Sequence, residues 1–320
     1  MKWPLVLHAV TVIALGVIAS QLVIKNRRDV QPALPINANE TARAYELPNT
    51  AVHDLPATLS NRRYQVWVDV PASYAGSTKL FPVVFVTDAN YSFPLIRSIR
   101  NLLGQRGRNI EDFILVGLPH AEGDTPAASR SRDYTPTNPL LDPKRDESQY
   151  SATQYGEAAA YRDYLEQQIF PFIAEHYRVD MQRKVFAGHS YGSLFGSYVL
   201  LTKPTMFQSY ILSSPSLWFD HKSVLRFEQQ YADEHKDLSA RVMLYSGSFE
   251  TIRPEPRYNK TADLVKDAQG FMQQLKARGY PSLQIGNQVI DDEDHLTIFP
   301  ITISRGLLWA LPGTGPYTGG

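Results

Sequence analysis

A serine between two glycines is the strongest chemical signal in the sequence. Residues 188–192 read Gly-His-Ser-Tyr-Gly, directly after the β-branched and apolar run 184–187 and before the helical stretch 191–201. A serine on a tight turn from a strand into a helix has a strained backbone, and a large side chain two residues to either side would collide with that turn. The pattern is that of a nucleophile elbow. It predicts Ser190 as a nucleophile.

A serine hydroxyl needs a base to take its proton and an acid to orient that base. In the strand-turn-helix architecture the chain order is serine, acid, histidine. Five of the eight histidines precede Ser190 in the chain and are excluded by this order. Two more, His221 and His235, follow Ser190 so closely that no later strand end is left between them for the acid. His295 remains. It follows a predicted strand at 283–290 and precedes a predicted helix, and we therefore predict that it is the base.

The acid is expected at the end of the strand that precedes the base. Glu250 follows the predicted strand at 241–245 by a few residues and is the leading candidate, with Asp294 and Glu293 as rivals beside the histidine. The acidic run 291–294 lacks the alternate-residue spacing of a calcium loop and is more typical of a solvated turn. The sequence thus favours Glu250 and leaves the choice of acid open.

The negative charge of a tetrahedral intermediate needs backbone donors. The helix after the serine aims its first amides at the site, which favours the amide of Tyr191. The second donor is expected in the loop after the strand at 81–86, where Asn90 is our choice and Ala89 and Tyr91 are alternatives. Sequence defines this second donor as a position rather than as one residue.

Aromatic and basic side chains near these loops are candidates for substrate binding. Tyr91 and Trp218 are expected near the carboxyl ends of the strands, where sites form in α/β folds, although core packing is an alternative for Trp218. Arg132 lies in a long segment rich in positive charge and could meet an acidic substrate. Aspartates and glutamates nearby balance that charge and favour an ion-paired role instead.

Short β-branched runs alternate with longer amphipathic segments, which indicates strands joined by helical crossovers. Two runs, 82–86 and 113–116, are apolar on both faces, as strands covered on both sides must be. The sequence therefore predicts an α/β fold with a mostly parallel central sheet and helices on both faces. Residues 121–151 show neither a helical nor a strand period and are expected to be a functional or disordered loop. Strands are predicted at 64–70, 81–86, 113–117, 184–187, 209–213, 241–245 and 283–290, and helices near 92–103, 156–177, 191–203, 222–233, 261–278 and 298–310.

The N-terminus carries an apolar run over 3–24, flanked by Lys2 and by a basic cluster at 25–28. This run is long enough to cross a bilayer as a helix, and it predicts a membrane anchor or signal segment at 1–28. A Pro- and Asn-rich linker is expected at 29–44, one catalytic domain at 45–311 and a flexible tail at 312–320. The predicted location is the periplasm, free or anchored to the inner membrane, with membrane contact through the N-terminal segment only.

Composition excludes several classes of protein. Lys plus Arg and Asp plus Glu are both 32, with no cysteine, and the pI is near 7.1. Balanced charge argues against a nucleic-acid partner, and the lack of cysteine removes disulfides and thiolate metal sites. No phosphate loop, dinucleotide fingerprint or zinc spacing occurs, so neither a cofactor nor a metal is expected. The oligomeric state is not predicted.

Several segments carry a family resemblance when taken in order. They are 63–66, 82–88, Arg-Asp-Tyr-Thr-Pro at 132–136, the serine elbow, Ser-Ser-Pro-Ser-Leu-Trp at 213–218, and His295. Across most of the domain the chain resembles the putative-esterase branch of the α/β-hydrolase superfamily, which includes esterase D and enterobactin-type siderophore esterases. The resemblance implies the α/β-hydrolase fold and ester hydrolysis through Ser190 and His295. The chain departs from the family pattern at Ala89 and Ser193, where glycine is common.

These observations together predict a serine carboxylic ester hydrolase. It is expected to act on a small-molecule ester, with a siderophore-type ester as one candidate, through an acyl-enzyme on Ser190. Two alternatives stay open at this point. An acyltransferase would use the same residues and pass the acyl group to an alcohol, and an exported binding protein could keep the fold without catalysis.

Overall fold

The computed structural model describes residues 45–57, 61–104, 106–145 and 150–315. Contacts divide the chain into two units, residues 1–47 and 48–320, and the second unit contains every helix and strand named below. The predicted anchor and linker lie outside the described residues, and the predicted tail is described as far as residue 315. Within the described ranges, no helix is both long and apolar enough to cross a membrane.

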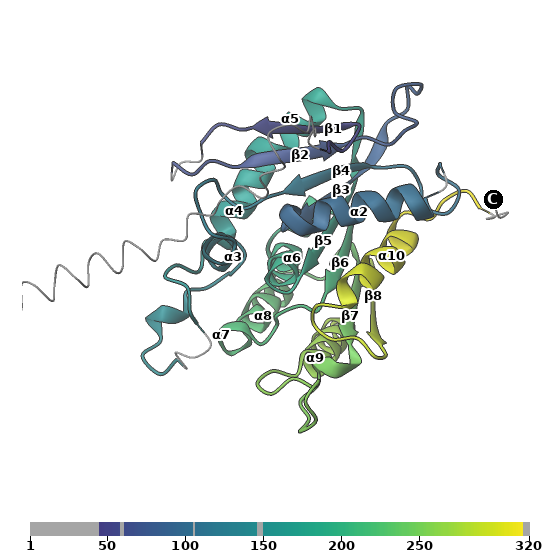
Figure 1. Cartoon of the computed structure of the whole chain (residues 1–320). Helices are drawn as coiled ribbons and strands as arrows, with labels where there is room; N and C mark the ends of the chain where they lie inside the picture. The colour runs from purple at the N-terminus through teal and green to yellow at the C-terminus, as the bar shows by residue number, and fades with distance from the viewer. Residues whose placement is uncertain (1–44, 58–60, 105, 146–149, 316–320) are drawn as a thin grey trace, which may run out of the picture. The chain divides into compact units, whose positions relative to one another are not determined.

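Eight strands form one sheet in the order β1-β2-β4-β3-β5-β6-β7-β8 (Figure 1). The first two strands pair antiparallel, and β2 also pairs antiparallel with β4, while all pairs from β4 to β8 are parallel. A parallel neighbour needs a crossover, which explains the helix between successive strands. The strands are β1 (Thr50–Asp54), β2 (Gln65–Asp69), β3 (Phe81–Thr87), β4 (Ile114–Leu118), β5 (Val179–His189), β6 (Ser209–Ser213), β7 (Ala240–Gly247) and β8 (Leu283–Ile290).

Helices cover both faces of the sheet, which confirms the predicted α/β-hydrolase class. On one face α2 (Ala89–Leu103) contacts α10 (Ile298–Ala310), and both cross the front of the sheet in Figure 1. On the other face α6 (Tyr191–Thr202) packs on β5 and touches α8 (Val224–Glu234). The remaining elements are α3 (Pro126–Asp133), α4 (Ala158–Tyr164), a π-helical stretch (Leu165–Ile169), α5 (Phe170–His176), α7 (Phe219–Lys222), α9 (Leu264–Ala277) and short 3₁₀ turns at Pro139–Leu141, Pro204–Met206 and Ser248–Glu250.

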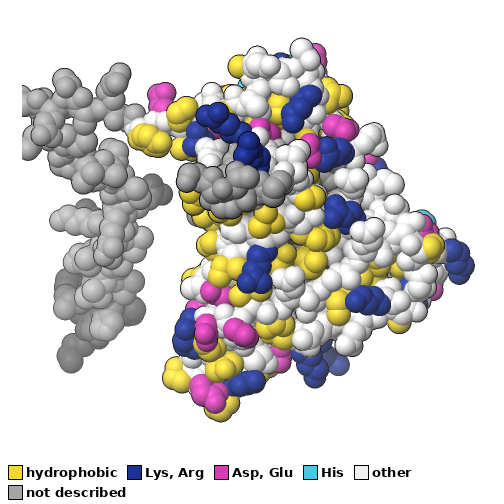
Figure 2. Space-filling view, turned by 90° about the vertical axis from the view of Figure 1, so that its right-hand side faces the viewer, with side chains coloured by type: hydrophobic (Ala, Val, Ile, Leu, Met, Phe, Trp, Pro, Cys, Tyr) yellow, Lys and Arg dark blue, Asp and Glu magenta, His cyan; other side chains and the backbone are white. Residues whose placement is uncertain are grey.

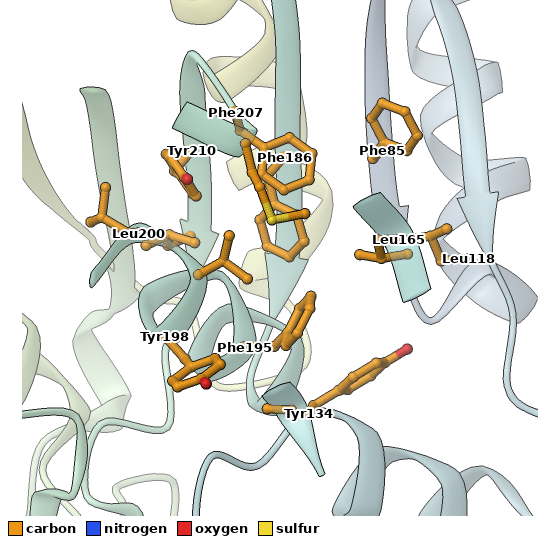
Figure 3. Close-up of a cluster of buried hydrophobic side chains, with 14 of the residues drawn as sticks. Phe85, Leu118, Tyr134, Leu165, Phe186, Phe195, Tyr198, Leu200, Phe207 and Tyr210 are labelled. Atoms are coloured by element: carbon orange, nitrogen blue, oxygen red, sulfur yellow. The ribbon is translucent and has the colours of Figure 1, made fainter. Parts of the chain in front are cut away.

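Aromatic side chains fill the core on the α6 face (Figure 3). Phe186 of β5 lies between Phe195 of α6 and Phe207, with ring centroids 6.0 and 5.3 Å from its own. All three side chains are at most 1% exposed. Edge and tilted ring contacts at these distances add to the free energy gained by burial. The strand that carries the predicted nucleophile is therefore fixed to the helix that follows it.

Two elements depart from the sequence prediction. Strand β1 is absent from that prediction, because it pairs only with β2 and has no fully buried residue that would give a clear pattern. Helix α3 lies inside 121–151, where the sequence predicts no helix. It lacks an apolar period, and it begins instead with Thr125 Oγ1 accepting from the Ala128 amide at 3.2 Å and with Pro126 in the first turn.

The surface charge is mixed. Figure 2 shows basic side chains scattered among acidic and apolar ones over the face that it presents. On this face the charges form no extended patch of one sign, in keeping with the balanced composition.

Candidate active site

Ser190 lies on a strained turn between β5 and α6. Its backbone has φ 58° and ψ −118°, a conformation that residues with a side chain rarely adopt. A Cβ on Gly188 would lie 2.6 Å from the backbone carbon of Gly192, and a Cβ on Gly192 would overlap Thr87 Oγ1. Both glycines are therefore required by close approach, as the elbow pattern predicts.

Glu250 and His295 meet by a short hydrogen bond. His295 Nδ1 lies 2.6 Å from Glu250 Oε1, and because a carboxylate only accepts, the ring donates through Nδ1. In the neutral imidazole, a ring that donates through Nδ1 has Nε2 as its acceptor, which is the arrangement that a general base requires. The Glu250 carboxylate is fully buried. Its Oε2 accepts from Ser214 Oγ and from the Gly247 amide, each at 2.7 Å.

The rival acid Asp294 faces other partners. Its Oδ1 accepts from the amides of Leu296 and Thr297 at 3.0 and 3.1 Å, and its Oδ2 accepts from Arg257 at 3.2 Å. The hydrogen bond from the backbone amide of Thr297 is the main reason why the pKa of Asp294 is lowered. Asp294 thus organises the turn that carries His295, while Glu250 is the carboxylate that the fold brings to the ring.

Ser190 and His295 line the same cavity, whose volume is ≈ 660 Å³. Ser190 Oγ lies 3.3 Å from Ser216 Oγ, and the His295 side chain is 35% exposed. Apolar side chains make up much of the remaining wall, which suits the body of an organic ester. They are Leu95, Leu296, Phe299, Pro126 and Pro300.

The first turns of two helices carry the candidate oxyanion donors. The Tyr91 amide donates to the Asp88 carbonyl at 3.2 Å and is thereby occupied. Ala89 is fully buried, whereas Asn90 is exposed and lines the cavity. Tyr191 begins α6, and first-turn amides have no intrahelical acceptor. Asn90 and Tyr191 therefore remain the better pair of donors.

A second carboxylate, Asp88, is buried behind side chains that line the cavity. It accepts from Arg130 Nε at 2.7 Å, from His120 Nε2 at 3.0 Å and from the Tyr91 hydroxyl at 3.3 Å. Burial opposes the charge of Arg130, but Asp88 holds the pKa of that guanidinium above its ordinary value. Arg130 and His120 both line the cavity; Arg130 belongs to the basic segment that the sequence marks as a possible substrate contact, whereas no local pattern marks His120.

The three predicted substrate residues have different surroundings. Tyr91 lines the cavity and is 45% exposed. Trp218 is not among the lining residues and packs near the Tyr191 ring, with centroids 6.3 Å apart. The prediction that Arg132 contacts the substrate needs correction. Arg132 is only 3% exposed, and its guanidinium pairs with Asp133 and Asp124. Two positions on a helix turn a side chain by about 200°, so Arg130 faces the cavity and Arg132 does not.

His189 lies beside the base. Its ring centroid is 4.7 Å from that of His295, and its Nδ1 is 3.2 Å from Ser213 Oγ. Burial, together with the nearby His295 and Arg130, lowers the pKa of His189 well below the ordinary value. It is therefore neutral at neutral pH and adds no second charge to the base. Among the residues that the structure describes, no three potential ligands form a group that could hold a metal ion.

Comparison with known proteins gives one family and several relatives. A family model described as "Putative esterase" matches residues 57–283, a range that contains Ser190 and Glu250 and ends before His295. Ferri-bacillibactin esterase BesA of Bacillus subtilis is 26% identical over 282 residues, which cover 87% of this chain and 94% of that protein. Apo-salmochelin esterase of Escherichia coli is 27% identical over 197 residues, with 62% and 59% covered.

Solved structures share the fold. The BES protein from Bacillus cereus superposes with a TM-score of 0.71 at 24% identity and covers 86% of this chain and 99% of its own. Siderophore hydrolase EstA from Aspergillus nidulans gives a TM-score of 0.69 at 21% identity, with 84% and 98% covered. The α/β fold is therefore shared with these structures over most of both chains.

Proposed function

The chain belongs to the "Putative esterase" family, in its enterobactin-type siderophore-esterase branch, and from that premise we propose an acyl-enzyme mechanism on Ser190. Membership in the family makes it a carboxylic ester hydrolase. The observation that carries the proposed mechanism is the 2.6 Å bond between Glu250 and His295, with Ser190 on the wall of the same cavity.

In the acylation step, His295 Nε2 takes the proton of Ser190 as Oγ attacks the ester carbonyl carbon. The carbonyl oxygen becomes an oxyanion, for which the amides of Tyr191 and Asn90 are the proposed donors. Collapse of this intermediate breaks the bond to the alcohol, and His295 returns its proton to the departing oxygen. Water then repeats the sequence on the acyl-enzyme and releases the acid.

Glu250 is the proposed third member because, within the described residues, no other cation pairs with its carboxylate. Its other two donors, Ser214 and the Gly247 amide, are neutral. When His295 accepts the serine proton, the imidazolium forms directly against a buried negative charge. The interaction is then stronger in the transition state than in the resting enzyme, which is the condition for catalysis.

The proposed substrates are siderophore-type esters. Support comes from relatives named as ferri-bacillibactin and apo-salmochelin esterases, one of which aligns over most of both chains. The cavity is consistent with such molecules, since it combines apolar walls with the hydrogen-bonding groups of Arg130 and His120. Hydrolysis of enterobactin, bacillibactin and simple aryl esters, compared under the same conditions by kcat/KM, tests this choice.

Labelling with a fluorophosphonate tests the nucleophile. The intact wild-type chain is expected to gain one phosphonyl group on the peptide that contains Ser190, because only an activated serine reacts. Ser190→Ala should remain unlabelled and lose at least about 10⁴-fold in kcat on p-nitrophenyl acetate. Full turnover by Ser190→Ala would refute the mechanism. Product analysis with added alcohol separates hydrolysis from acyl transfer.

We also propose that the catalytic domain lies outside the cytoplasm, held by or released from the N-terminal segment. The support is the apolar run at 3–24 between basic residues. In a Gram-negative host the full-length chain should fractionate with membranes or periplasm, and removal of residues 1–28 should leave active enzyme in the cytosol. Full-length protein found wholly in the cytosol would contradict the proposal.

A further inference from the structure

The loop that ends β6 lies between two catalytic elements. In the sheet, β6 is flanked by β5, which leads to Ser190, and by β7, which leads to Glu250. Ser213 pairs in register with His189 on one side and with Tyr245 on the other. A short loop at this point can therefore touch both the nucleophile and the acid.

Backbone hydrogen bonds tie this loop to the elbow and to β7. The Ser190 amide donates to the Ser213 carbonyl at 3.0 Å, and the Ser216 amide donates to the Ser190 carbonyl at 3.3 Å. The Ser214 amide donates to the Tyr245 carbonyl at 2.7 Å. Ser214 also has φ 44°, a strained conformation for a residue with a side chain. Strain of this kind persists only where surrounding contacts fix the backbone.

Two hydroxyls of the loop contact the catalytic side chains. Ser214 Oγ donates to Glu250 Oε2 at 2.7 Å, and Ser216 Oγ lies 3.3 Å from Ser190 Oγ. Both serines are at most 1% exposed, so water does not compete readily for these bonds.

We propose that Ser214 and Ser216 are positioning residues, which hold the carboxylate of Glu250 and the hydroxyl of Ser190 in the arrangement that proton transfer needs. The proposal rests on the proposed catalytic roles of Ser190, His295 and Glu250. It assigns a function to the Ser-Pro-Ser segment 214–216, which the proposed mechanism leaves without one.

Ser214 acts on the acid by occupying one of its two oxygens. Together with the Gly247 amide it binds Oε2, which directs Oε1 at His295. Both donors are neutral, so the carboxylate keeps its full charge for the imidazolium. Without Ser214, the buried carboxylate of Glu250 loses one hydrogen bond, and rotation about its side-chain torsion is less restricted.

Ser216 acts on the nucleophile by donating a hydrogen bond to it. A serine hydroxyl has a single hydrogen, and catalysis requires that the Ser190 hydrogen point at His295. The arrangement competent for reaction therefore has Ser216 as donor and Ser190 Oγ as acceptor. The same bond stabilises negative charge on Oγ as its proton leaves.

A double-mutant cycle tests Ser214. Ser214→Ala is expected to lower kcat about tenfold with KM little changed, the value of one hydrogen bond of about 1.4 kcal/mol. In a Glu250→Gln background the same change should cost less than about twofold, because Ser214 acts through that carboxylate. Equal losses in both backgrounds, or no loss in the wild type, would overturn its role. If Ser214→Ala does not fold, Ser214→Cys, which keeps a weaker donor, should give a smaller loss with the same coupling.

The rate of fluorophosphonate labelling tests Ser216. The reagent reacts directly with the nucleophile, so its rate does not depend on the contacts that bind a complete ester substrate. Ser216→Ala should slow the second-order rate about tenfold, and Ser216→Thr, which keeps the hydroxyl, should recover most of it. Ser209→Ala is the matched control. Ser209 is a fully buried serine at the other end of β6 whose hydroxyl has no hydrogen-bond partner within the described part of the chain.

The outcomes separate this inference from the proposed function. A wild-type chain that is not labelled at Ser190 would refute the catalytic role on which the inference depends. Normal labelling of the wild type, with Ser216→Ala and Ser209→Ala equally fast, would refute the role of Ser216 alone. A slow Ser216→Ala with a wild-type-like Ser216→Thr and Ser209→Ala is the expected result.

Discussion

Two carboxylate–histidine pairs face the same cavity, and only one is proposed to be catalytic. Glu250 pairs with His295 at 2.6 Å and Asp88 pairs with His120 at 3.0 Å. Both carboxylates are fully buried, and each follows the end of a parallel strand. Both histidines line the cavity.

The two pairs differ in what else binds the carboxylate. Asp88 also accepts from the Arg130 guanidinium, so its charge is already neutralised. In the described part of the chain, Glu250 has only neutral donors besides the histidine. The histidines differ in access too, since the side chain of His120 is 8% exposed and that of His295 is 35% exposed. A buried carboxylate stabilises a new imidazolium more strongly when no other cation already balances its charge.

Substitution of the two histidines should give the largest difference. His295→Asn is expected to lower kcat by about 10⁴-fold, since the proton acceptor is removed. His120→Asn should cost less than about tenfold, because Arg130 and Tyr91 still bind Asp88 and no proton transfer is assigned to the ring. Steady-state kinetics on one aryl ester measures both. Similar losses for the two variants would end the distinction between the pairs.

The acids should differ by a smaller factor. Glu250→Gln is expected to lower kcat about 10³-fold with little change in KM, because the lost charge acts mainly in the transition state. Asp294→Asn should stay within about threefold, as its carboxylate faces Leu296, Thr297 and Arg257 instead of the His295 ring. The same assay serves, with circular dichroism to verify folding. A greater loss for Asp294→Asn would transfer the acid's role to that residue.

The smallest effect concerns two arginines of α3, the helix beside the Asp88 pair. Arg132→Met should lower the free energy of unfolding by about 3 kcal/mol, because the buried Asp133 loses its cationic partner and retains the neutral donors Tyr64 and Ser129. Arg130→Met should cost less, about 2 kcal/mol, since its side chain is 26% exposed and the buried Asp88 retains the hydrogen bonds from His120 and Tyr91. Urea denaturation gives both values. Arg130→Met should also alter KM, because Arg130 lines the cavity. A change in KM for Arg132→Met alone would contradict the placement of Arg130 at the cavity and of Arg132 in the interior.

Local patterns were sufficient for strands β2 to β8 and for the turn that carries Ser190. Buried parallel strands such as β3 and β4 are apolar at nearly every position, and the elbow glycines are demanded by contacts within a few residues or with the adjacent strand. Chain order then singled out His295, because strands in a parallel sheet bring their carboxyl ends to one edge. These features depend on short-range steric contacts and on the hydrophobic period along the chain, and both can be deduced from the order of the residues.

Tertiary structure alone decided which charged groups meet. The sequence favoured Glu250 but left Asp294 as a rival, since the distance of each from the His295 ring depends on how β7 and β8 pair and turn. The sequence contains no apolar period at α3, which begins at a capping threonine and whose arginines pair with Asp88, far away in the sequence, and with Asp124. Arg130 and Arg132 look alike in the sequence, and helical rotation sends one to the cavity and one into the protein. Pairing between charges is a property of three-dimensional distance, and sequence separation carries little information about it.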